Sequence, residues 1–371
     1  MVTNNQSRCS QLLQGLLLVI LAAAGIICYP SCAQEADQVT AQVVSPGEYQ
    51  VVQRDAANQG SIPVVVHIDG EPTTVEARLE LMPGPYKGAT TDWMALTATN
   101  QAGKYTGELT AMAGGWYELQ VRVPAGAGNP TLATVPHIGV GEVFITAGQS
   151  NTANRGKCNT PADDRVVTFD GQGWRPAYDP QPGNDGEGGT PWPFLGDMLA
   201  RSLQMPIGFA CRAVGGTPSK FWLPGAEGYS GLKTVVQQLG VNGARAVLWH
   251  QGESDSQQNT SAETYADNLT RTIKQLNQDA GYDIPWVVAQ ASFLTNVTPE
   301  AMQQVREGQR LLWQRGIALP GPTTDDLLGP VYREPDEVHL NVTGKQVYAD
   351  RLFAMLWAQF YANVRLVMPG G

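Results

Sequence analysis

The chain has 371 residues, of which 42% are hydrophobic and only 16% are charged. This composition excludes a disordered or collagen-like chain, and the length favours two globular domains. The net charge of −10 argues against nucleic acid or an anionic membrane as a partner.

The first 33 residues have the pattern of an export signal. Arg8 is their only charged residue, Leu12 to Ile27 is almost entirely apolar, and the small residues Ser31 and Ala33 precede a cleavage point. We therefore predict a signal peptide over 1–33 and a secreted or periplasmic protein, with an uncleaved membrane anchor as the alternative. No later hydrophobic run is long enough to span a bilayer, so no stable membrane insertion of the mature chain is expected.

From residue 34 to 140 the sequence predicts a β-rich domain without a catalytic cluster. Short strands alternate with polar or glycine-containing breaks, and no helical period is sustained. His67 lies among strand residues and is predicted to be packed. The regular spacing favours a β-sandwich of the immunoglobulin-like kind. The strands are predicted at 62–68, 75–81, 93–97 and 117–123.

From residue 141 to 371 predicted strands and helices alternate. Such a pattern favours an α/β domain of three layers, with a five-stranded parallel sheet between helices. In these sheets the active site lies at the carboxyl ends of the strands. Strands are predicted at 142–147, 207–213, 244–250, 284–291 and 316–319, and helices at 193–203, 232–239, 262–279, 299–313 and 343–360.

Ser150 follows the first of these strands by three residues, in the sequence Gly148-Gln149-Ser150-Asn151. A serine at a strand-to-loop turn is exposed, and the backbone N–H groups beside it can point at an oxyanion. Serine is also common in ordinary turns and helix caps, so this position alone does not identify a nucleophile.

Three further clusters of candidate site residues follow a predicted strand or precede the last predicted helix. Gly215-Gly216-Thr217 ends the second strand, where a glycine pair lets the backbone approach a ligand. The polar run from His250 to Asp255 follows the third strand. Asp336 and His339 precede the last helix, and their spacing suits an aspartate that fixes the tautomer of a histidine base. Together they supply a nucleophile, a base, an acid and oxyanion donors.

Four segments of the chain resemble the ordered motifs of the SGNH hydrolase superfamily. More narrowly, they are similar to its sialate O-acetylesterase-like branch of carbohydrate acetylesterases, over about 141–360. The resemblance implies a flavodoxin-like fold, with Ser150 as nucleophile, His339 as base and Asp336 as its partner. The segments are Gly148-Gln149-Ser150-Asn151, Gly215-Gly216-Thr217, Trp249-His250-Gln251-Gly252-Glu253-Ser254 and Asp336-Glu337-Val338-His339.

The resemblance also implies an oxyanion hole and leaves one acid open. The donors would be the N–H groups of Ser150 and Gly216 and the side-chain amide of Gln251, where the wider superfamily has asparagine. The N–H group of a residue adjacent to Gly216 is the alternative. Glu253 is a second acid that could help or replace Asp336.

The implied function is a secreted serine esterase that removes O-acetyl groups from a carbohydrate through an acetyl-serine intermediate, with no cofactor. A lipase or thioesterase of the same superfamily is one alternative, and a catalytically inactive carbohydrate-binding surface protein is another. No Gly-x-Ser-x-Gly motif of ordinary α/β-hydrolases occurs. Which sugar is deacetylated and the oligomeric state stay open.

A few residues near the motifs have two interpretations each. Trp192, Phe221 and Trp222 could stack on a sugar ring or belong to the core. The acidic, glycine-rich loop 179–189 could bind calcium, although a solvated loop is favoured. Cys158 could pair with Cys211 in an oxidising compartment, but nothing in the sequence fixes their separation. No metal is predicted at the cysteines, because no CxxC or histidine cluster accompanies them.

Overall fold

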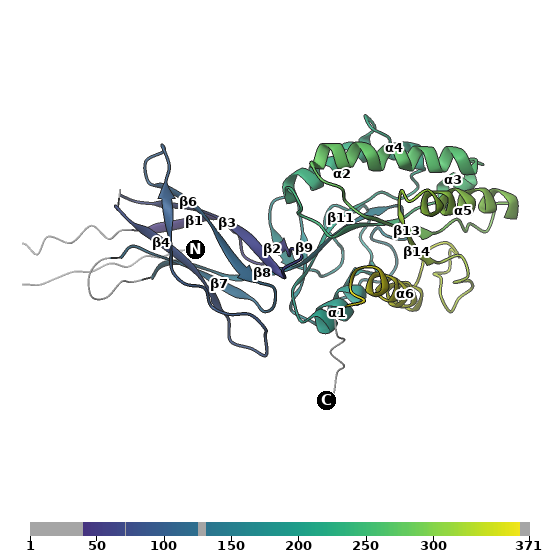
Figure 1. Ribbon diagram of the computed structural model, residues 1–371. Helices are drawn as coiled ribbons and strands as arrows, with labels where there is room; N and C mark the ends of the chain where they lie inside the picture. The colour runs from purple at the N-terminus through teal and green to yellow at the C-terminus, as the bar shows by residue number, and fades with distance from the viewer. Residues whose placement is uncertain (1–39, 71, 125–130, 364–371) are drawn as a thin grey trace, which may run out of the picture. The chain divides into compact units, whose positions relative to one another are not determined.

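The structure is a computed structural model that describes residues 40–70, 72–124 and 131–363 (Figure 1). The predicted signal peptide over 1–33 lies outside the described residues. None of the helices in the described ranges is both long and apolar enough to cross a membrane.

The β-rich half is a chain of antiparallel pairs in the order β1-β3-β6-β5-β4-β7-β8. All four predicted strands are confirmed, with ends that shift by up to three residues, whereas β1, β2 and β6 were not predicted. The immunoglobulin-like assignment goes beyond these pairings and stays a prediction. The strands are β1 Ala41–Ser45, β2 Val51–Gln53, β3 Gln59–Ile68, β4 Val75–Leu81, β5 Met94–Ala98, β6 Lys104–Met112 and β7 Tyr117–Arg122.

The longest strand of this half, β3, shows why these segments form a sheet with one buried face. Ile62, Val64, Val66 and Ile68 are at most 3% exposed, and the residues between them face outward or are only partly covered. Because successive side chains of a strand point to opposite faces, His67 lies on the outer face and is exposed. The prediction that His67 is packed was wrong.

Strand β8, Thr131–Gly148, belongs to both halves of the chain. Its first part pairs antiparallel with β7, and its last residues, from Glu142 to Gly148, pair in parallel with β11 and β12. The strand therefore runs without interruption through the predicted boundary at residue 140. The division into domains at this point stays a prediction, but no loop separates them there.

The second half contains the predicted parallel sheet. Its order is β10-β9-β11-β8-β12-β13-β14, and β10 alone is antiparallel to its neighbour. Four of the five predicted strands correspond to β8, β11, β12 and β13, whereas the fifth, predicted at 316–319, lies at Leu319–Thr323 as β14 and shares one residue with the prediction. The order of the five strands, 2-1-3-4-5, is flavodoxin-like. Strands β9 and β10 were not predicted. The bounds are β9 Val166–Phe169, β10 Trp174–Pro176, β11 Ile207–Ala213, β12 Ala246–His250, β13 Trp286–Gln290 and β14 Leu319–Thr323.

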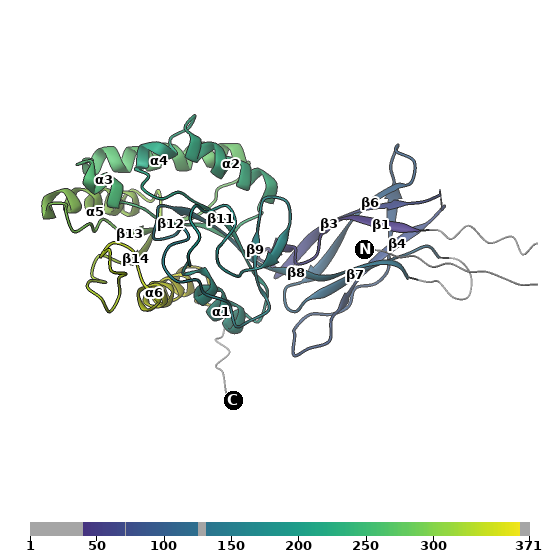
Figure 2. The same cartoon turned by 180° about the vertical axis from the view of Figure 1, so that it is seen from behind.

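Helices cover both faces of this sheet, as Figures 1 and 2 show from opposite sides. Strand β8 supplies both cores: Phe144 packs on the side of α1 and α6, and Ile145 on the side of α2, α4 and α5. The predicted helices are confirmed, and the short α3 is additional. The bounds are α1 Trp192–Leu203, α2 Glu227–Leu239, α3 Glu253–Gln257, α4 Ala262–Ala280, α5 Pro299–Gln314 and α6 Val342–Phe360.

Two tryptophans that could have stacked on a sugar belong to these cores. Trp192 and Trp222 are both 0% exposed, and Trp222 packs edge-on against Trp249 with ring centroids 5.3 Å apart. Phe221 is partly buried against the same cluster. The hydrophobic interior thus accounts for both tryptophans, and neither is available to a sugar.

Candidate active site

The site forms where the strand order of the parallel sheet reverses, around the end of β8. Gly148 pairs with Ala213 of β11 on one side and with His250 of β12 on the other. Gly148 has φ of +135°, and a Cβ on it would lie 2.0 Å from the His250 carbonyl oxygen. Only glycine fits at this position, because a side chain would collide with β12. The close approach places the residues that follow β8 next to those that follow β11 and β12.

Ser150 lies in the turn that follows Gly148. The turn is closed by hydrogen bonds to the Gln149 carbonyl from the Thr152 hydroxyl at 2.8 Å and the Thr152 N–H at 2.9 Å. Ser150 is 6% exposed, which is less than the sequence led us to expect. Among the described residues its backbone N–H and its hydroxyl have no hydrogen-bond partner. Both groups are therefore free to act on a bound molecule.

Asp336 and His339 form the predicted pair just before α6. His339 Nδ1 lies 2.6 Å from Asp336 Oδ2, and Asp336 Oδ1 accepts the N–H groups of Val338 and His339 at 2.9 Å each. Partial burial raises the pKa of Asp336, but these hydrogen bonds outweigh it and hold the pKa below its usual value. An ionised Asp336 keeps the proton of His339 on Nδ1 and leaves a lone pair on Nε2.

The glycine pair after β11 has one free N–H group. The Gly215 N–H donates to Asp185 Oδ2 at 3.0 Å, and the same carboxylate pairs with Arg155 at 2.9 Å. Gly216 has φ of +69°, no heavy atom lies within 4 Å of the place a Cβ would take, and no described residue accepts its N–H. Of the two candidates, Gly216 is the one with an available donor.

Asp185 belongs to the loop 179–189 that could have bound calcium. Its neighbour Asn184 accepts the Ala213 N–H at 2.7 Å and donates to the Thr152 carbonyl at 3.1 Å. The loop thus uses its polar side chains to join the ends of β8 and β11. Within the described ranges no group of three or more potential protein ligands gathers around a metal position.

Gln251 does not take the place predicted for it. Its side chain is 0% exposed, and Nε2 lies 2.7 Å from Asp255 Oδ2, 3.1 Å from the Thr217 carbonyl and 3.2 Å from Gln149 Oε1. An amide nitrogen has two hydrogens, so these acceptors leave none for an oxyanion. The predicted third oxyanion donor is here a link between the loops, because the carboxylate of Asp255 one helical turn away attracts it.

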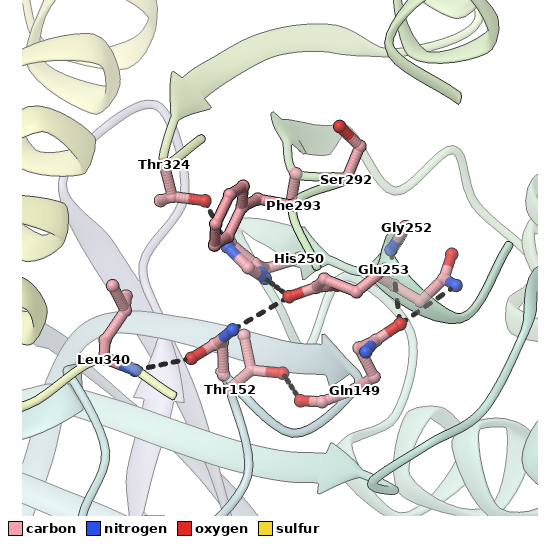
Figure 3. A network of polar contacts seen from close by, with 12 residues as sticks. Gln149, Thr152, His250, Gly252, Glu253, Ser292, Phe293, Thr324 and Leu340 are labelled. Atoms are coloured by element: carbon pink, nitrogen blue, oxygen red, sulfur yellow. Dashed lines mark hydrogen bonds and ion pairs between the residues drawn. The ribbon is translucent and has the colours of Figure 1, made fainter. Parts of the chain in front are cut away.

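Gln149 is a site residue that the sequence reasoning missed. Besides Gln251, its Oε1 accepts the N–H groups of Gly252 at 3.3 Å and Ser254 at 3.1 Å (Figure 3). The Ser150 turn is therefore fastened to the start of α3. The position of Gln149 inside the quoted serine motif was the only signal available.

Glu253 does not contact His339. Its Oε1 accepts Asn151 Nδ2 at 2.8 Å. The same oxygen lies 4.0 Å from His250 Nδ1, and Figure 3 shows Glu253 beside His250. His250 is fully buried and bonds Thr324 Oγ1 through Nε2 at 2.8 Å. The structure therefore does not bring the second acid to the base, and it assigns Glu253 to the nucleophile's turn instead.

The loop that carries His339 is held from two sides. Asn151 Oδ1 accepts the Leu340 N–H at 2.9 Å, while the buried guanidinium of Arg333 donates to the Val338 carbonyl and, at 3.2 Å, to the Thr324 carbonyl. Burial lowers the pKa of Arg333. Asn341 then caps α6 by accepting the Gly344 N–H at 3.0 Å. The base is thus fixed in a short loop between an arginine clamp and a capped helix.

The two cysteines of the described chain are both free. Cys158 is exposed, and Cys211 is buried in β11, where burial raises the pKa of its thiol to about 12. The disulfide that the sequence left open is absent from this pair in the structure.

Comparison with known proteins decides the family. A family profile described as carbohydrate esterase, sialic acid-specific acetylesterase matches residues 140–358, which is more than half of the chain. The chain belongs to this carbohydrate esterase family. The matched range contains Ser150, Gly216, Gln251, Asp336 and His339, and the resemblance to the SGNH branch is confirmed.

Individual relatives agree with the family. Over 75 residues the chain is 39% identical to a probable carbohydrate esterase of Arabidopsis thaliana, a stretch that is 20% of this chain and 29% of that protein. Its structure is similar to a carbohydrate acetylesterase from Xanthomonas citri, with a TM-score of 0.55 and 19% identity over 85% of this chain and 74% of the other. At this identity the likeness shows the fold, a mixed α/β sheet with helices.

Proposed function

We propose that this family member is an exported serine esterase that removes O-acetyl groups from a carbohydrate through an acetyl-serine intermediate. The observation that carries the proposal is the Asp336–His339 pair, 2.6 Å apart, on a loop hydrogen-bonded to the residue after Ser150. Membership of the carbohydrate esterase family supports a sugar ester as the substrate.

In the first half of the reaction, Ser150 attacks the acetyl carbonyl. His339 Nε2 takes the hydroxyl proton as Oγ forms its bond to the carbonyl carbon, and Asp336 stabilises the imidazolium. The N–H groups of Ser150 and Gly216 hold the resulting oxyanion, and one donor of this kind contributes about 3 kcal/mol. The bond to the sugar oxygen then breaks, and His339 gives that oxygen its proton.

In the second half, water releases acetate from Ser150. His339 Nε2 takes a proton from the water as the water oxygen attacks the acetyl-serine carbonyl. The same two N–H groups hold the second oxyanion, and the proton returns to Ser150 Oγ as the ester bond breaks. No described residue bonds His339 Nε2, and catalytic hydrogen bonds often shorten only when substrate binds.

The test is acetate release from acetylated sialic acids, xylan and pectin by wild type and by Ser150→Ala. We expect release from at least one glycan by wild type and none by the variant, which should stay folded. Ser230→Ala is the matched control, because this hydroxyl bonds only the carbonyl of Ala226, the residue before α2. Acetate release by folded Ser150→Ala at the wild-type rate would refute the proposal.

Two further measurements separate the alternatives. A lipase or thioesterase of the same superfamily would prefer a long-chain ester to an acetyl ester. A catalytically inactive binding protein would resist a serine-directed phosphonate, which we expect to label Ser150. The proposed export rests on the pattern of residues 1–33, and a mature protein that begins at Gln34 outside the cytoplasm would support it.

A further inference from the structure

Asn151 follows Ser150 directly, and its side chain reaches both sides of the base. Its Oδ1 accepts the Leu340 N–H at 2.9 Å, and its Nδ2 lies 3.4 Å from the Val338 carbonyl. Val338 and Leu340 are the residues on either side of His339. One amide, 5% exposed, therefore spans the gap between the turn of the nucleophile and the loop of the base.

Glu253 determines which way this amide faces. Its Oε1 accepts Asn151 Nδ2 at 2.8 Å, and the residue is 2% exposed at the start of α3. A carboxylate oxygen can accept a hydrogen bond from Nδ2 but can form none with Oδ1. Glu253 therefore selects the orientation with Nδ2 toward its Oε1, which leaves Oδ1 toward the Leu340 N–H.

We propose that Asn151 and Glu253 are positioning residues that set the separation and orientation of Ser150 Oγ and His339 Nε2. Glu253 acts through Asn151 and not on His339 itself. The inference rests on the proposed function, because this separation matters to activity only if Ser150 is the nucleophile and His339 the base.

The expected effect is on turnover. A misplacement of about 1 Å between reacting groups costs on the order of 10²-fold in rate. Substrate binding does not depend on the alignment of Ser150 with His339, so KM should change little. A purely structural role would instead lower the fraction of folded protein and leave the kcat of the folded fraction unchanged.

The test exchanges donor and acceptor in the Asn151–Glu253 hydrogen bond. Asn151→Asp places two carboxylates in contact and should lower kcat on p-nitrophenyl acetate about 10²-fold. Glu253→Gln keeps an acceptor for Asn151 but can also donate, so it should lower kcat less than Asn151→Asp does. The double variant restores a hydrogen bond, now donated by residue 253, and should recover most of the lost kcat.

Asn277→Asp is the matched control. Asn277 Nδ2 lies 3.1 Å from Asp283 Oδ1, and its Oδ1 accepts the Ile284 N–H at 3.2 Å. The same arrangement of an amide between a carboxylate and a backbone N–H thus occurs near the end of α4, on segments that carry no site residue. Its kcat should equal that of wild type.

The outcomes distinguish the proposals. The positioning role would be overturned if folded Asn151→Asp kept the wild-type kcat, or if the double variant were no more active than Asn151→Asp. In either case, phosphonate labelling of Ser150 in the wild type would still support the proposed function. If wild-type Ser150 is neither labelled nor needed for hydrolysis, both proposals fail. Should Asn151→Asp not fold, Glu253→Leu removes the orienting acceptor, and an unchanged kcat in it would reject the pair.

Discussion

A ladder of polar side chains on β4 and β7 shows how these groups behave when water can reach them. Arg122 Nη2 lies 2.7 Å from Glu76, with side chains 21% and 22% exposed. Arg78 Nε donates to Gln120 Oε1 at 2.9 Å in the same row. A group in such a ladder that loses its partner returns to water, so each contact contributes little.

Around the ends of β8 and β12 the same kinds of group are buried. Asn151, Gln251, Glu253 and Asp255 are at most 5% exposed, and each bonds at least one of the others or a backbone group. A buried polar group that loses its partner keeps the full cost of having left water. Burial, more than the type of residue, therefore decides where a substitution in this protein is costly.

The largest effect is expected at an exposed residue, where a substitution should lower turnover but not stability. The Asp336 side chain is 49% exposed, yet it holds the tautomer of His339. We expect Asp336→Asn to lower kcat by about 10⁴-fold while the free energy of unfolding changes little. The measurements are turnover of p-nitrophenyl acetate and urea unfolding. Turnover near that of wild type would mean that His339 works without this carboxylate.

Asp255 tests the buried network itself. Its carboxylate accepts the Ser219 N–H at 2.6 Å, the Ser219 hydroxyl at 2.8 Å and Gln251 Nε2 at 2.7 Å. Asp255→Ala leaves the two Ser219 donors without an acceptor, removes the nearest acceptor of Gln251, and should lower the free energy of unfolding by about 3 kcal/mol. Urea unfolding measures the change in the free energy of unfolding. A loss as small as that expected for an exposed residue of the β4–β7 ladder would show that burial does not decide the cost of a substitution.

His250 is expected to make the free energy of unfolding depend on pH. Burial lowers its pKa in the folded protein, although Glu253 and Asp325 act in the opposite direction. Below the ordinary value of 6.5 the unfolded chain binds a proton that the folded protein does not. The free energy of unfolding should therefore fall as the pH falls through 6.5 and level off below the folded pKa.

Urea unfolding of wild type and His250→Gln between about pH 7.5 and 5.5 checks this dependence. The wild type should lose more stability over this range than the variant does. Equal losses would show that other groups account for the dependence.

The smallest effect is expected on the exposed ladder. Arg122→Ala removes the ion pair with Glu76 and the contact of the guanidinium with the Trp93 ring, 3.9 Å from its centroid. We expect the free energy of unfolding to fall by at most about 1 kcal/mol, with unchanged acetyl ester hydrolysis. A larger loss would show that contacts of the exposed ladder contribute as much to stability as those of the buried network.

Most of the fold could be predicted because its signals are local. Strands such as Ala246–His250 are buried on both faces and form continuous apolar runs, and the helices between them keep an apolar stripe. Val166–Phe169 has four residues and Trp174–Pro176 has three, too short for a period to be recognised. The first is a strand because the edge of β11 offers hydrogen bonds to it, and the second because it pairs with the first.

The same distinction between local and long-range contacts applies to the candidate site. The contact of Asp336 with His339 follows from a separation of three residues, so the sequence predicted it. The orientation of Gln251 depends on Asp255 and on Gln149, which lies 102 residues away in sequence. The choice of Gly216 likewise depends on Asp185 occupying the N–H of Gly215. Contacts between distant segments of this kind have no signature in a single sequence.

The shared strand β8 limits how this protein can be divided. A fragment that starts at residue 141 would begin inside a strand and would lose the residues that pair with β2 and β7. Val140 and Ile138, both 0% exposed in the whole chain, would be missing from the core to which they contribute. Limited proteolysis should therefore spare the middle of β8. The half that carries Ser150 is expected to stay soluble alone only if it retains this strand from Thr131.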